Sequence, residues 1–296
     1  MPYARAADGV RLHYEVLGRN GAPVVLMIQG LGADKHGWDM QLYLLAMRYR
    51  VVAFDNRGAG RSDKPFNSYS LEQMADDAVA VLDQIGVQSA HVVGASMGGA
   101  ISLLVASRHP QRVDSLVLAC TAGRNHQWRR ELLDGWATAA TEQGMGAMTR
   151  EAARWVIGPR SFRRLMPMFG WLGPLAMGRP AHAFTAQVRA IVAHADPPPE
   201  MFASITAPAL VIVGNQDILT PRGDSEELVE QLPNAELVVI SGAAHGLMIE
   251  HATTFNRVLF EFLGRVTRTQ RAAAADSEAC ASSAGRVDSP AGVVAR

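Results

Sequence analysis

The sequence predicts an α/β fold in which a mostly parallel sheet carries helices on both faces. Short, continuously apolar runs recur along the 296-residue chain, and segments with helical periodicity separate them. Strands of a parallel sheet are buried on both faces, so they read as uninterrupted apolar runs. Small-residue loops follow several of these runs, and ligands of such sheets bind beyond the carboxyl ends of the strands.

The expected strands begin with an alternating, half-buried segment and continue with apolar runs. They are residues 12–16, 24–28, 50–54, 90–93, 113–119, 209–213 and 236–240. The expected helices are residues 40–47, 71–85, 100–109, 225–232 and 252–263. Ser70 and Gln73 form a capping-box pattern, which predicts the start of the second helix.

One long segment interrupts the alternation of strands and helices. Residues 122–199 contain no strand pattern but accumulate large apolar side chains: Trp128, Trp136, Trp155, Phe162, Met166, Met168, Phe169, Trp171, Met177 and Phe184. We interpret the segment as a helical cap inserted over the carboxyl edge of the sheet. Most of these side chains would form the cap's own core, and the rest would line a pocket.

The remaining residues divide into a core and a tail. Residues 1–121 and 200–265 are expected to form the α/β core. From about residue 266 the composition shifts to Ala, Ser, Arg and Asp without periodicity. Residues 266–296 are therefore expected to be a disordered tail, although the alanines at 272–275 could extend the last helix.

Composition narrows the classes of function. Apolar residues make up 48% and charged residues 19% of a chain with zero formal net charge, which is typical of a globular protein and favours neither nucleic acid nor an anionic membrane as partner. The two cysteines, Cys120 and Cys280, provide neither a disulfide framework nor paired metal ligands. The chain shows no signal-peptide core and no membrane-spanning run. We expect a cytoplasmic protein without metal or cofactor. Assembly into a homo-oligomer is possible and is left open by the sequence.

Ser96 lies in a G-x-S-x-G pattern between the strand at 90–93 and the helix at 100–109. A serine at such a junction occupies a sharp, strained turn that projects its Oγ above the sheet. Gly94 and Gly98 are needed because a Cβ at either position would collide with crowded backbone. The pattern predicts a nucleophile.

A serine nucleophile requires a base and an acid that orients the base. Among nine histidines, His245 follows the strand at 236–240 on a small-residue loop and is the expected base. Asp217 follows the strand at 209–213 and is the expected acid, although an aspartate there can also stabilise a turn. Asp224 is instead interpreted as the cap of the next helix. The order Ser, Asp, His along the chain matches this architecture.

Two backbone amides are candidates for stabilising an oxyanion. The N–H of Met97 begins the helix after the serine, where amides are unpaired and the helix dipole favours an anion. The N–H of Leu31 lies in the glycine-rich turn after the strand at 24–28, Gln29-Gly30-Leu31-Gly32. Loss of one such donor typically costs roughly 2.7–4 kcal/mol of transition-state stabilisation.

These loops together resemble the α/β-hydrolase family over nearly all of residues 1–265. The serine pattern carries the resemblance, and so do Asp55-Asn56-Arg57-Gly58-Ala59-Gly60-Arg61-Ser62, Gly214-Asn215-Gln216-Asp217 and Gly242-Ala243-Ala244-His245. The chain is most similar to 3-oxoadipate enol-lactonases, cofactor-free haloperoxidase-like esterases and carbon–carbon bond hydrolases. The resemblance implies an eight-stranded sheet and structural roles for Asp55 and Arg57.

Two departures from the family pattern bear on the chemistry. Gln29 stands where many members have histidine before the glycine of the oxyanion turn, which affects how that turn is held. Ser96 stands where the epoxide-hydrolase and haloalkane-dehalogenase branches need an aspartate nucleophile, so both branches are disfavoured.

The expected function is a serine hydrolase that cleaves a small or medium carboxylic ester or lactone through an acyl-enzyme. In this scheme Ser96 is the nucleophile, His245 the base and Asp217 the orienting acid, while the amides of Leu31 and Met97 bind the oxyanion. A carbon–carbon bond hydrolase and a perhydrolase or haloperoxidase would use the same triad. A ligand-binding protein without catalysis is the alternative from another class.

Substrate contacts are expected from the oxyanion turn and from the insertion. The candidates are Gly30, Trp128 and Trp155. Three arginines at the start of the insertion either pair with an anionic substrate group or form a solvated helix face: Arg124, Arg129 and Arg130.

Overall fold

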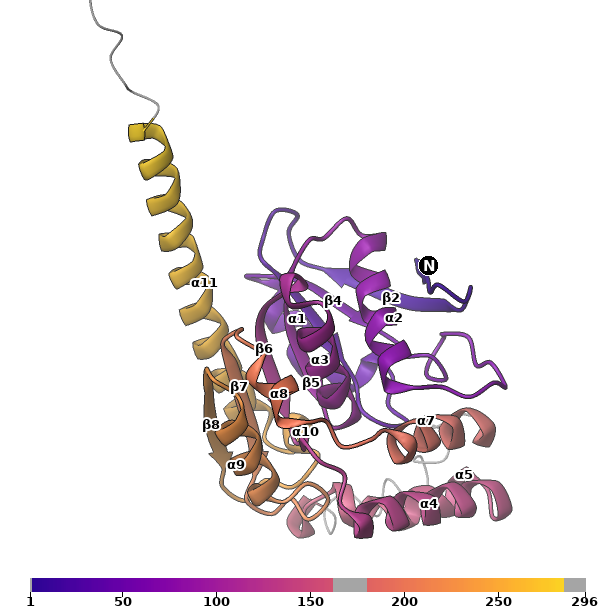
Figure 1. The fold of residues 1–296 in the computed structure, drawn as a ribbon. Helices are drawn as coiled ribbons and strands as arrows, with labels where there is room; N and C mark the ends of the chain where they lie inside the picture. Colours follow the sequence, from indigo (N-terminus) through magenta and orange to yellow (C-terminus); the bar gives the residue numbers. More distant parts are fainter. Residues whose placement is uncertain (1, 162–179, 285–296) are drawn as a thin grey trace, which may run out of the picture.

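The computed structural model describes residues 2–161 and 180–284 (Figure 1). Its single sheet has eight strands in the order β1-β2-β4-β3-β5-β6-β7-β8. The strands are β1 (Tyr3–Arg5), β2 (Arg11–Leu17), β3 (Val24–Ile28), β4 (Arg50–Phe54), β5 (Ala90–Ala95), β6 (Val113–Ala119), β7 (Ala209–Gly214) and β8 (Ala235–Ile240). Only the β1–β2 and β2–β4 pairs are antiparallel, which confirms the prediction of a mostly parallel, eight-stranded sheet.

The helices lie on both faces of this sheet. The α-helices are α1 (Asp39–Ala46), α2 (Leu71–Gln84), α3 (Met97–Arg108), α4 (Gln127–Glu142), α5 (Met145–Val156), α7 (Ala181–Ala193), α8 (Pro199–Ala203), α9 (Arg222–Gln231), α10 (Leu247–Glu250) and α11 (Ala252–Ala284). Two short 3₁₀ helices, η1 (Lys35–Trp38) and η2 (Pro110–Arg112), complete the set in the described ranges. Ser70 accepts a hydrogen bond from the Gln73 N–H at 3.1 Å and so begins α2 as expected. The Gln73 side chain donates to Asp8 at 2.9 Å, so only the Ser70 half of the capping-box pattern is confirmed.

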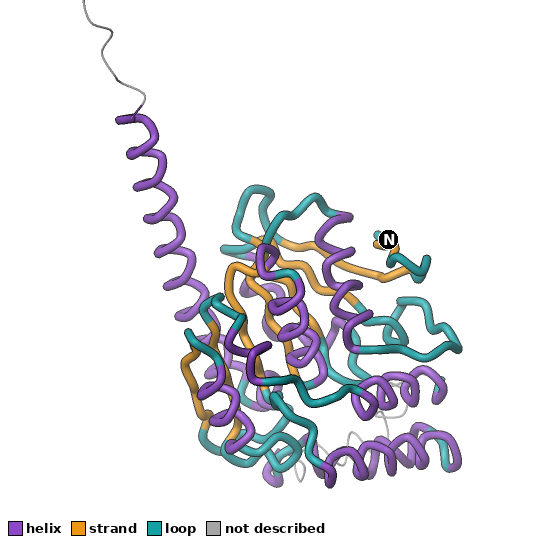
Figure 2. The backbone as a smooth tube through the Cα atoms, viewed as in Figure 1, coloured by secondary structure: helices purple, strands orange, loops and turns teal. Residues whose placement is uncertain are grey.

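Alternate strand residues point to opposite faces and build two cores. In β3, for example, Leu26 and Ile28 join the core beneath α2, α3 and α9, whereas Val25 and Met27 join the core beneath α1 and α11. Figure 2 shows the orange strands between the two layers of purple helices. Burial on both faces is the reason that these strands read as continuous apolar runs.

The register brings the carboxyl ends of the central strands to one edge. Ile28 at the end of β3 pairs with Gly94, and Ala95 at the end of β5 pairs with Ala119 at the end of β6. At the other side of the sheet, Gly214 at the end of β7 pairs with Ile240 at the end of β8. The loops that follow these strands therefore emerge side by side.

The segment between β6 and β7 contains helices and no strand among its described residues. Figure 1 shows α4, α5 and α7 grouped together beyond the sheet. They form a core of their own that includes Leu133, Trp136, Met148, Phe184 and Val188. We call residues 122–199 the insertion. Several of its apolar residues lie outside the described part of the chain: Phe162, Met166, Met168, Phe169, Trp171 and Met177.

Helix α11 differs from the expectation for the C-terminal region. The sequence predicts a last helix that ends near residue 263 and a disordered tail from 266, with a helical extension through the alanines at 272–275 left open. Helix α11 continues to Ala284 and projects from the body of the protein (Figure 1). Residues 265–284 contain neither Gly nor Pro and include the four alanines at 272–275. Alanine has the highest helix propensity, which favours continuation.

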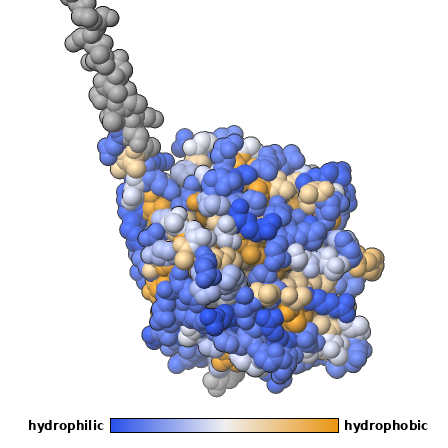
Figure 3. Space-filling model, in the orientation of Figure 1, coloured by the Kyte–Doolittle hydropathy of each residue, from blue (hydrophilic) through white to orange (hydrophobic). Residues whose placement is uncertain are grey.

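The surface in Figure 3 is mostly hydrophilic, with scattered apolar residues. Within the described ranges, no helix combines the length and the apolarity needed to cross a membrane.

Candidate active site

Ser96 occupies the junction between β5 and α3 in a backbone conformation that is rare for a residue with a side chain. Its φ is 54° and its ψ is −121°. Such a conformation costs of order 1–3 kcal/mol and persists where neighbouring contacts enforce it. Here the Ser96 N–H donates to the Ala119 carbonyl at 2.9 Å, and the Thr121 hydroxyl donates to the Ser96 carbonyl at 2.8 Å. The end of β6 thus holds the serine in the strained turn.

The glycines of the serine pattern are required by close packing. A Cβ on Gly94 would overlap the carbonyl oxygen of Gly98, and a Cβ on Gly98 would overlap the carbonyl oxygen of Ile28. The predicted reason for both glycines is confirmed. The first turn of α3 consequently packs directly against the end of β3.

The structure brings Ser96, His245 and Asp217 into one row of hydrogen bonds. His245 Nε2 lies 3.0 Å from Ser96 Oγ, and His245 Nδ1 lies 2.9 Å from Asp217 Oδ2. His245 is 6% exposed and Asp217 is 5% exposed, whereas Ser96 is half-buried. The row therefore runs from the interior to a more open position at the serine.

The surroundings of Asp217 keep its carboxylate charged. Oδ1 accepts from the N–H groups of Leu219 and Thr220 at 2.9 Å each, and Oδ2 accepts from the Thr220 hydroxyl at 2.8 Å. Burial by itself would raise the pKa of Asp217, but His245 and these hydrogen bonds hold the pKa below its ordinary value. A charged carboxylate only accepts, so His245 Nδ1 donates to it and Nε2 is left to accept from Ser96.

Thr220 is a residue that sequence reasoning missed. Its hydroxyl donates to Asp217 and lies 3.2 Å from His245 Nδ1. The available signal was a threonine three residues after an aspartate that follows a strand, where a hydroxyl can return to the carboxylate. The hydrogen bonds from the Leu219 and Thr220 N–H groups to Asp217 also stabilise a turn, which was the alternative interpretation of this aspartate. Asp217 can therefore both stabilise the turn and orient His245.

The turn after β3 lies against the serine. A Cβ placed on Gly30 would lie 3.1 Å from Ser96 Cβ and 3.8 Å from Ser96 Oγ. Gln29, which departs from the family's histidine, folds its side chain back so that Oε1 accepts from the Gly30 N–H at 2.9 Å. The Asn56 side chain donates to the Gln29 carbonyl at 2.9 Å. The carboxamide of Gln29 thereby holds the turn itself.

The amides of this turn are accounted for with one exception. In the described part of the chain, the N–H of Leu31 has no hydrogen-bond acceptor. Its neighbours all donate: the Gly30 N–H to Gln29 Oε1 at 2.9 Å, the Gly32 N–H to Gln187 Oε1 at 2.9 Å, and the Ala33 N–H to the Gly30 carbonyl at 3.1 Å. The N–H of Met97, the first residue of α3, likewise has no acceptor among the described residues. These two are the amides expected from the sequence to stabilise an oxyanion.

The chain matches the alpha/beta hydrolase fold family over residues 23–252. It belongs to the α/β-hydrolase family. It is 32% identical over 261 residues to the protein named "Putative carbamate hydrolase RutD" from Caulobacter vibrioides strain NA1000 / CB15N, with 85% of this chain and 95% of that protein covered.

Two solved structures superpose closely on this chain. An enol-lactonase from Burkholderia xenovorans LB400 gives a TM-score of 0.82 at 28% identity, covering 89% of this chain and all of that one. A meta-cleavage product hydrolase from Pseudomonas fluorescens IP01 gives a TM-score of 0.76 at 26% identity, covering 90% and 98% of the two chains. The expected similarity to enol-lactonases is confirmed.

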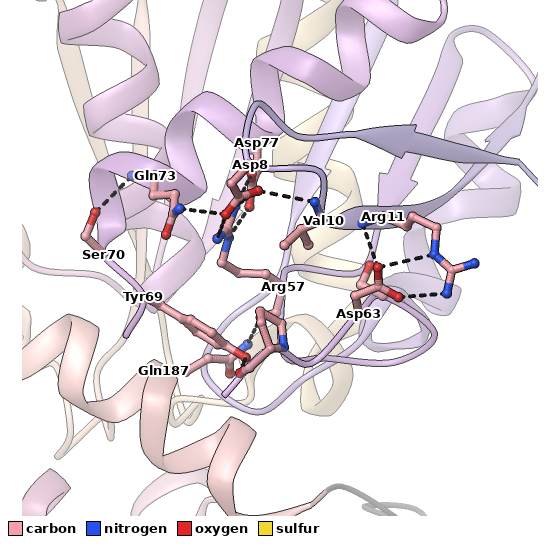
Figure 4. Close-up of polar contacts among 12 residues, drawn as sticks. Asp8, Val10, Arg11, Arg57, Asp63, Tyr69, Ser70, Gln73, Asp77 and Gln187 are labelled. Atoms are coloured by element: carbon pink, nitrogen blue, oxygen red, sulfur yellow. Dashed lines mark hydrogen bonds and ion pairs between the residues drawn. The ribbon is translucent and has the colours of Figure 1, made fainter. Parts of the chain in front are cut away.

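In this α/β-hydrolase the loop after β4 is occupied by structural contacts. Arg57 is fully buried and binds Asp77 through two hydrogen bonds of 2.6 and 2.7 Å, with Asp8 at 2.9 Å (Figure 4). Burial raises the pKa of Asp77 although Arg57 opposes the shift. Asp55 accepts from the N–H groups of Lys35 and Arg61 at 2.9 Å each. These contacts agree with the structural roles that the family resemblance implied for Asp55 and Arg57.

The two tryptophans expected to bind substrate contact each other. The rings of Trp128 and Trp155 stack with centroids 6.2 Å apart and an interplanar angle of 22°. Trp128 also lies beneath the Arg129 guanidinium, 4.9 Å from its ring centroid. The role of these rings in substrate binding stays a prediction, as does that of Gly30.

The three arginines at the start of the insertion are engaged by protein groups. Arg124 pairs with Glu227 and Arg130 with Asp196, each at 2.9 Å. Arg129 is 5% exposed and pairs with Asp224, so it does not belong to a solvated helix face.

Asp224 is not the helix cap that the sequence suggested, because α9 begins at Arg222 after Pro221. Burial raises the pKa of Asp224, and Arg129 opposes that shift. The described residues contain no group of three or more His, Cys, Asp or Glu side chains arranged to hold a metal ion.

Proposed function

We propose that this protein is a serine hydrolase that cleaves a carboxylic ester or lactone through an acyl-enzyme. The observation that carries the proposal is the row of hydrogen bonds from Asp217 through His245 to Ser96, at 2.9 and 3.0 Å. A nucleophile, a base within hydrogen-bond reach and a group that orients the base form the arrangement that acyl transfer requires.

The chemistry follows from the charge of Asp217. Because Asp217 accepts from His245 Nδ1, the Nε2 atom takes the proton of Ser96 as the serine oxygen attacks the substrate carbonyl. The carbonyl oxygen becomes an oxyanion, and the amides of Leu31 and Met97, which have no acceptor in the described ranges, are the donors proposed to bind it. His245 then protonates the departing alcohol, and a water molecule activated by the same imidazole releases the acid and restores the serine hydroxyl.

Relatives of this chain support the class of substrate. The similar structure from Burkholderia xenovorans is titled an enol-lactonase, and the relative from Caulobacter vibrioides is named for carbamate hydrolysis. Esters, lactones and carbamate esters all present a carbonyl carbon with an oxygen leaving group. A panel of aryl esters of graded acyl length, simple lactones and an aryl carbamate therefore covers the proposed range.

A second candidate is a carbon–carbon bond hydrolase, favoured by the similar structure titled a meta-cleavage product hydrolase. Such an enzyme should turn over vinylogous 1,5-diketones and act poorly on simple aryl esters. A perhydrolase would share the catalytic row, and addition of peroxide to the ester assay would reveal it. A protein that only binds a ligand would be stabilised by that ligand and would turn over no member of the panel.

The test compares the parent protein with Ser96→Ala on this panel. We expect hydrolysis by the parent and a loss of kcat on the order of 10⁶-fold in the variant, as found when the nucleophile of a comparable catalytic unit is removed. Ser107→Ala is the matched control, because among the described residues its hydroxyl, also on α3, bonds only the Leu104 carbonyl of its own helix, at 3.2 Å. Equal turnover by the parent and Ser96→Ala would exclude the proposal.

A further inference from the structure

Two buried polar side chains connect the insertion to loops of the candidate site. Gln187 on α7 is 1% exposed, and Arg129 on α4 is 5% exposed. A buried polar group without a partner is costly, so the groups that such side chains contact indicate what they hold in place. Both side chains bind main-chain atoms of loops that follow strands of the sheet.

Gln187 bridges the oxyanion turn and the loop after β4. Its Oε1 accepts from the Gly32 N–H at 2.9 Å, and its Nε2 donates to the Arg57 carbonyl at 2.8 Å. Both ends of the carboxamide are therefore used, each on a different loop of the sheet domain.

The hydrogen bond from Gly32 to Gln187 fixes the orientation of the Leu31–Gly32 peptide, which could otherwise flip. The turn is closed by a hydrogen bond from the Ala33 N–H to the Gly30 carbonyl at 3.1 Å, and Gly32 has a φ of +65°. A positive φ at this position is typical of a type II turn, which differs from type I by a flip of the central peptide. By accepting from Gly32, Gln187 holds the peptide next to the Leu31 N–H in one orientation.

Arg129 acts on the loop that carries Asp217. Its Nε donates to the Leu219 carbonyl at 2.8 Å, and its guanidinium also pairs with Asp224. The N–H of the same Leu219 donates to Asp217 Oδ1 at 2.9 Å. Arg129 thus restrains the residue that in turn holds the carboxylate.

We propose that Gln187 and Arg129 are positioning residues through which the insertion sets the geometry of the oxyanion turn and of the acid loop. The inference rests on the proposed hydrolase function and extends it, because it assigns the insertion a part in the chemical step as well as in binding. Within the described ranges neither side chain forms a hydrogen bond with Ser96, and the hydrogen bonds that each does form with the sheet domain lie on the loops.

This role predicts a particular kinetic signature. An oxyanion donor contributes more in the transition state than in the ground state, so a displaced turn lowers kcat and leaves KM nearly unchanged. A general loosening of the insertion would instead disturb the binding of substrate and change KM.

The first test compares Gln187→Met with Gln187→Glu, using the best aryl ester of the panel. Methionine fills a similar volume but cannot accept strongly from the Gly32 N–H. We expect kcat to fall at least about ten-fold, a smaller loss than the roughly 10²–10³-fold seen when an oxyanion donor is removed outright. Glutamate keeps the acceptor for Gly32 and loses the donor to the Arg57 carbonyl, so its kcat should lie between those of the parent and Gln187→Met.

Matched controls separate positioning from stability. His194→Gln weakens another contact of the α7 region with the sheet domain, the 2.9 Å bond to Glu72, without touching a site loop. Arg130→Gln is the control for Arg129→Met, because in the described part of the chain the side chain of Arg130 bonds to groups of the insertion itself. We expect both controls to lower Tm and keep the parent kcat, whereas Arg129→Met lowers kcat at least about five-fold, as expected for a misplaced partner of the base.

Hydrogen exchange gives a readout that does not depend on turnover. The Gly32 amide should exchange faster in Gln187→Met than in the parent and in His194→Gln. Unchanged Gly32 exchange together with the parent kcat in Gln187→Met would overturn the inference, and so would equal losses of kcat in the variants and their controls. Full turnover by Ser96→Ala would instead refute the proposed function, whatever the Gln187 variants do.

Discussion

The Thr220 hydroxyl lies between the two groups whose hydrogen bond orients the proposed base. It donates to Asp217 Oδ2 at 2.8 Å and lies 3.2 Å from His245 Nδ1. This contact helps to hold the pKa of Asp217 below its ordinary value against the effect of burial. Thr220 therefore helps to keep Asp217 charged, and Asp217 in turn orients His245.

Replacement of Thr220 by valine keeps the shape of the side chain and removes its hydroxyl. A hydrogen bond to a charged group contributes about 1.5–3 kcal/mol, so we expect kcat/KM for aryl esters to fall roughly ten-fold or more. Thr220→Ser restores a hydroxyl and should recover most of the rate. If Thr220→Val kept the kcat/KM of the parent, the backbone N–H groups at positions 219 and 220 would suffice to hold Asp217, and the role assigned to the hydroxyl would be wrong.

Single residues were predictable from the sequence where their place relative to a strand end was enough. Ser96, Asp217 and His245 each follow an apolar run, and the register of a parallel sheet brings such positions to one edge. Gln187 was not predictable, because its partner Gly32 lies 155 residues away and their contact depends on how α7 packs. A glutamine in an amphipathic helix carries no local signal of that contact.

At the scale of elements, the apolar runs predicted the central strands well, whereas the first strand and the length of the last helix were not predicted. Strand β1 was missed because it has three residues, of which only Ala4 is buried. The length of α11 was underestimated because its outer part lacks apolar periodicity while its helix propensity stays high. The 3.6-residue pattern reports packing against the body, and α11 extends beyond the residues that pack there.

Strands β5 and β6 and helix α11 share a buried histidine that couples their packing to pH. His91 lies 2.8 Å from the Ser115 hydroxyl and 3.2 Å from the Thr267 hydroxyl. Burial lowers the pKa of His91, and the nearby Asp114 only partly opposes the shift. The folded state therefore disfavours the protonated form.

The sign of the resulting pH dependence follows from proton uptake. Below the ordinary histidine pKa of about 6.5 the unfolded chain binds a proton at this position that the folded chain does not, so acidification favours unfolding. We expect the free energy of unfolding to fall with decreasing pH in this range, by at most about 1.4 kcal/mol per pH unit for this one proton. Urea unfolding of the parent and of His91→Gln between pH 7 and pH 5 measures it. The variant should lose this part of the slope, and identical slopes would contradict the account.

At the scale of the whole molecule, the loops after the sheet strands carry the groups proposed to react, and the insertion contacts those loops. The fold and the edge of the sheet that bears the site were predictable, because they follow from apolar patterning and from the handful of loops after the strands. The contacts of the insertion were not predictable. From the sequence, the arginines at its start could pair with a substrate anion or form a solvated helix face. In the structure Arg129 instead bonds to the Leu219 carbonyl and pairs with Asp224.

The central claim is that Ser96 forms a covalent acyl intermediate, and the most direct test is to trap that bond. A fluorophosphonate reacts with an activated serine and mimics the tetrahedral intermediate, so the modified peptide can be located by mass spectrometry. We predict a single adduct on Ser96 in the parent protein and none in Ser96→Ala, with slower labelling in Asp217→Asn because His245 is then no longer held by a charged carboxylate. An adduct on another residue, or equal labelling of the parent and Ser96→Ala, would contradict the account.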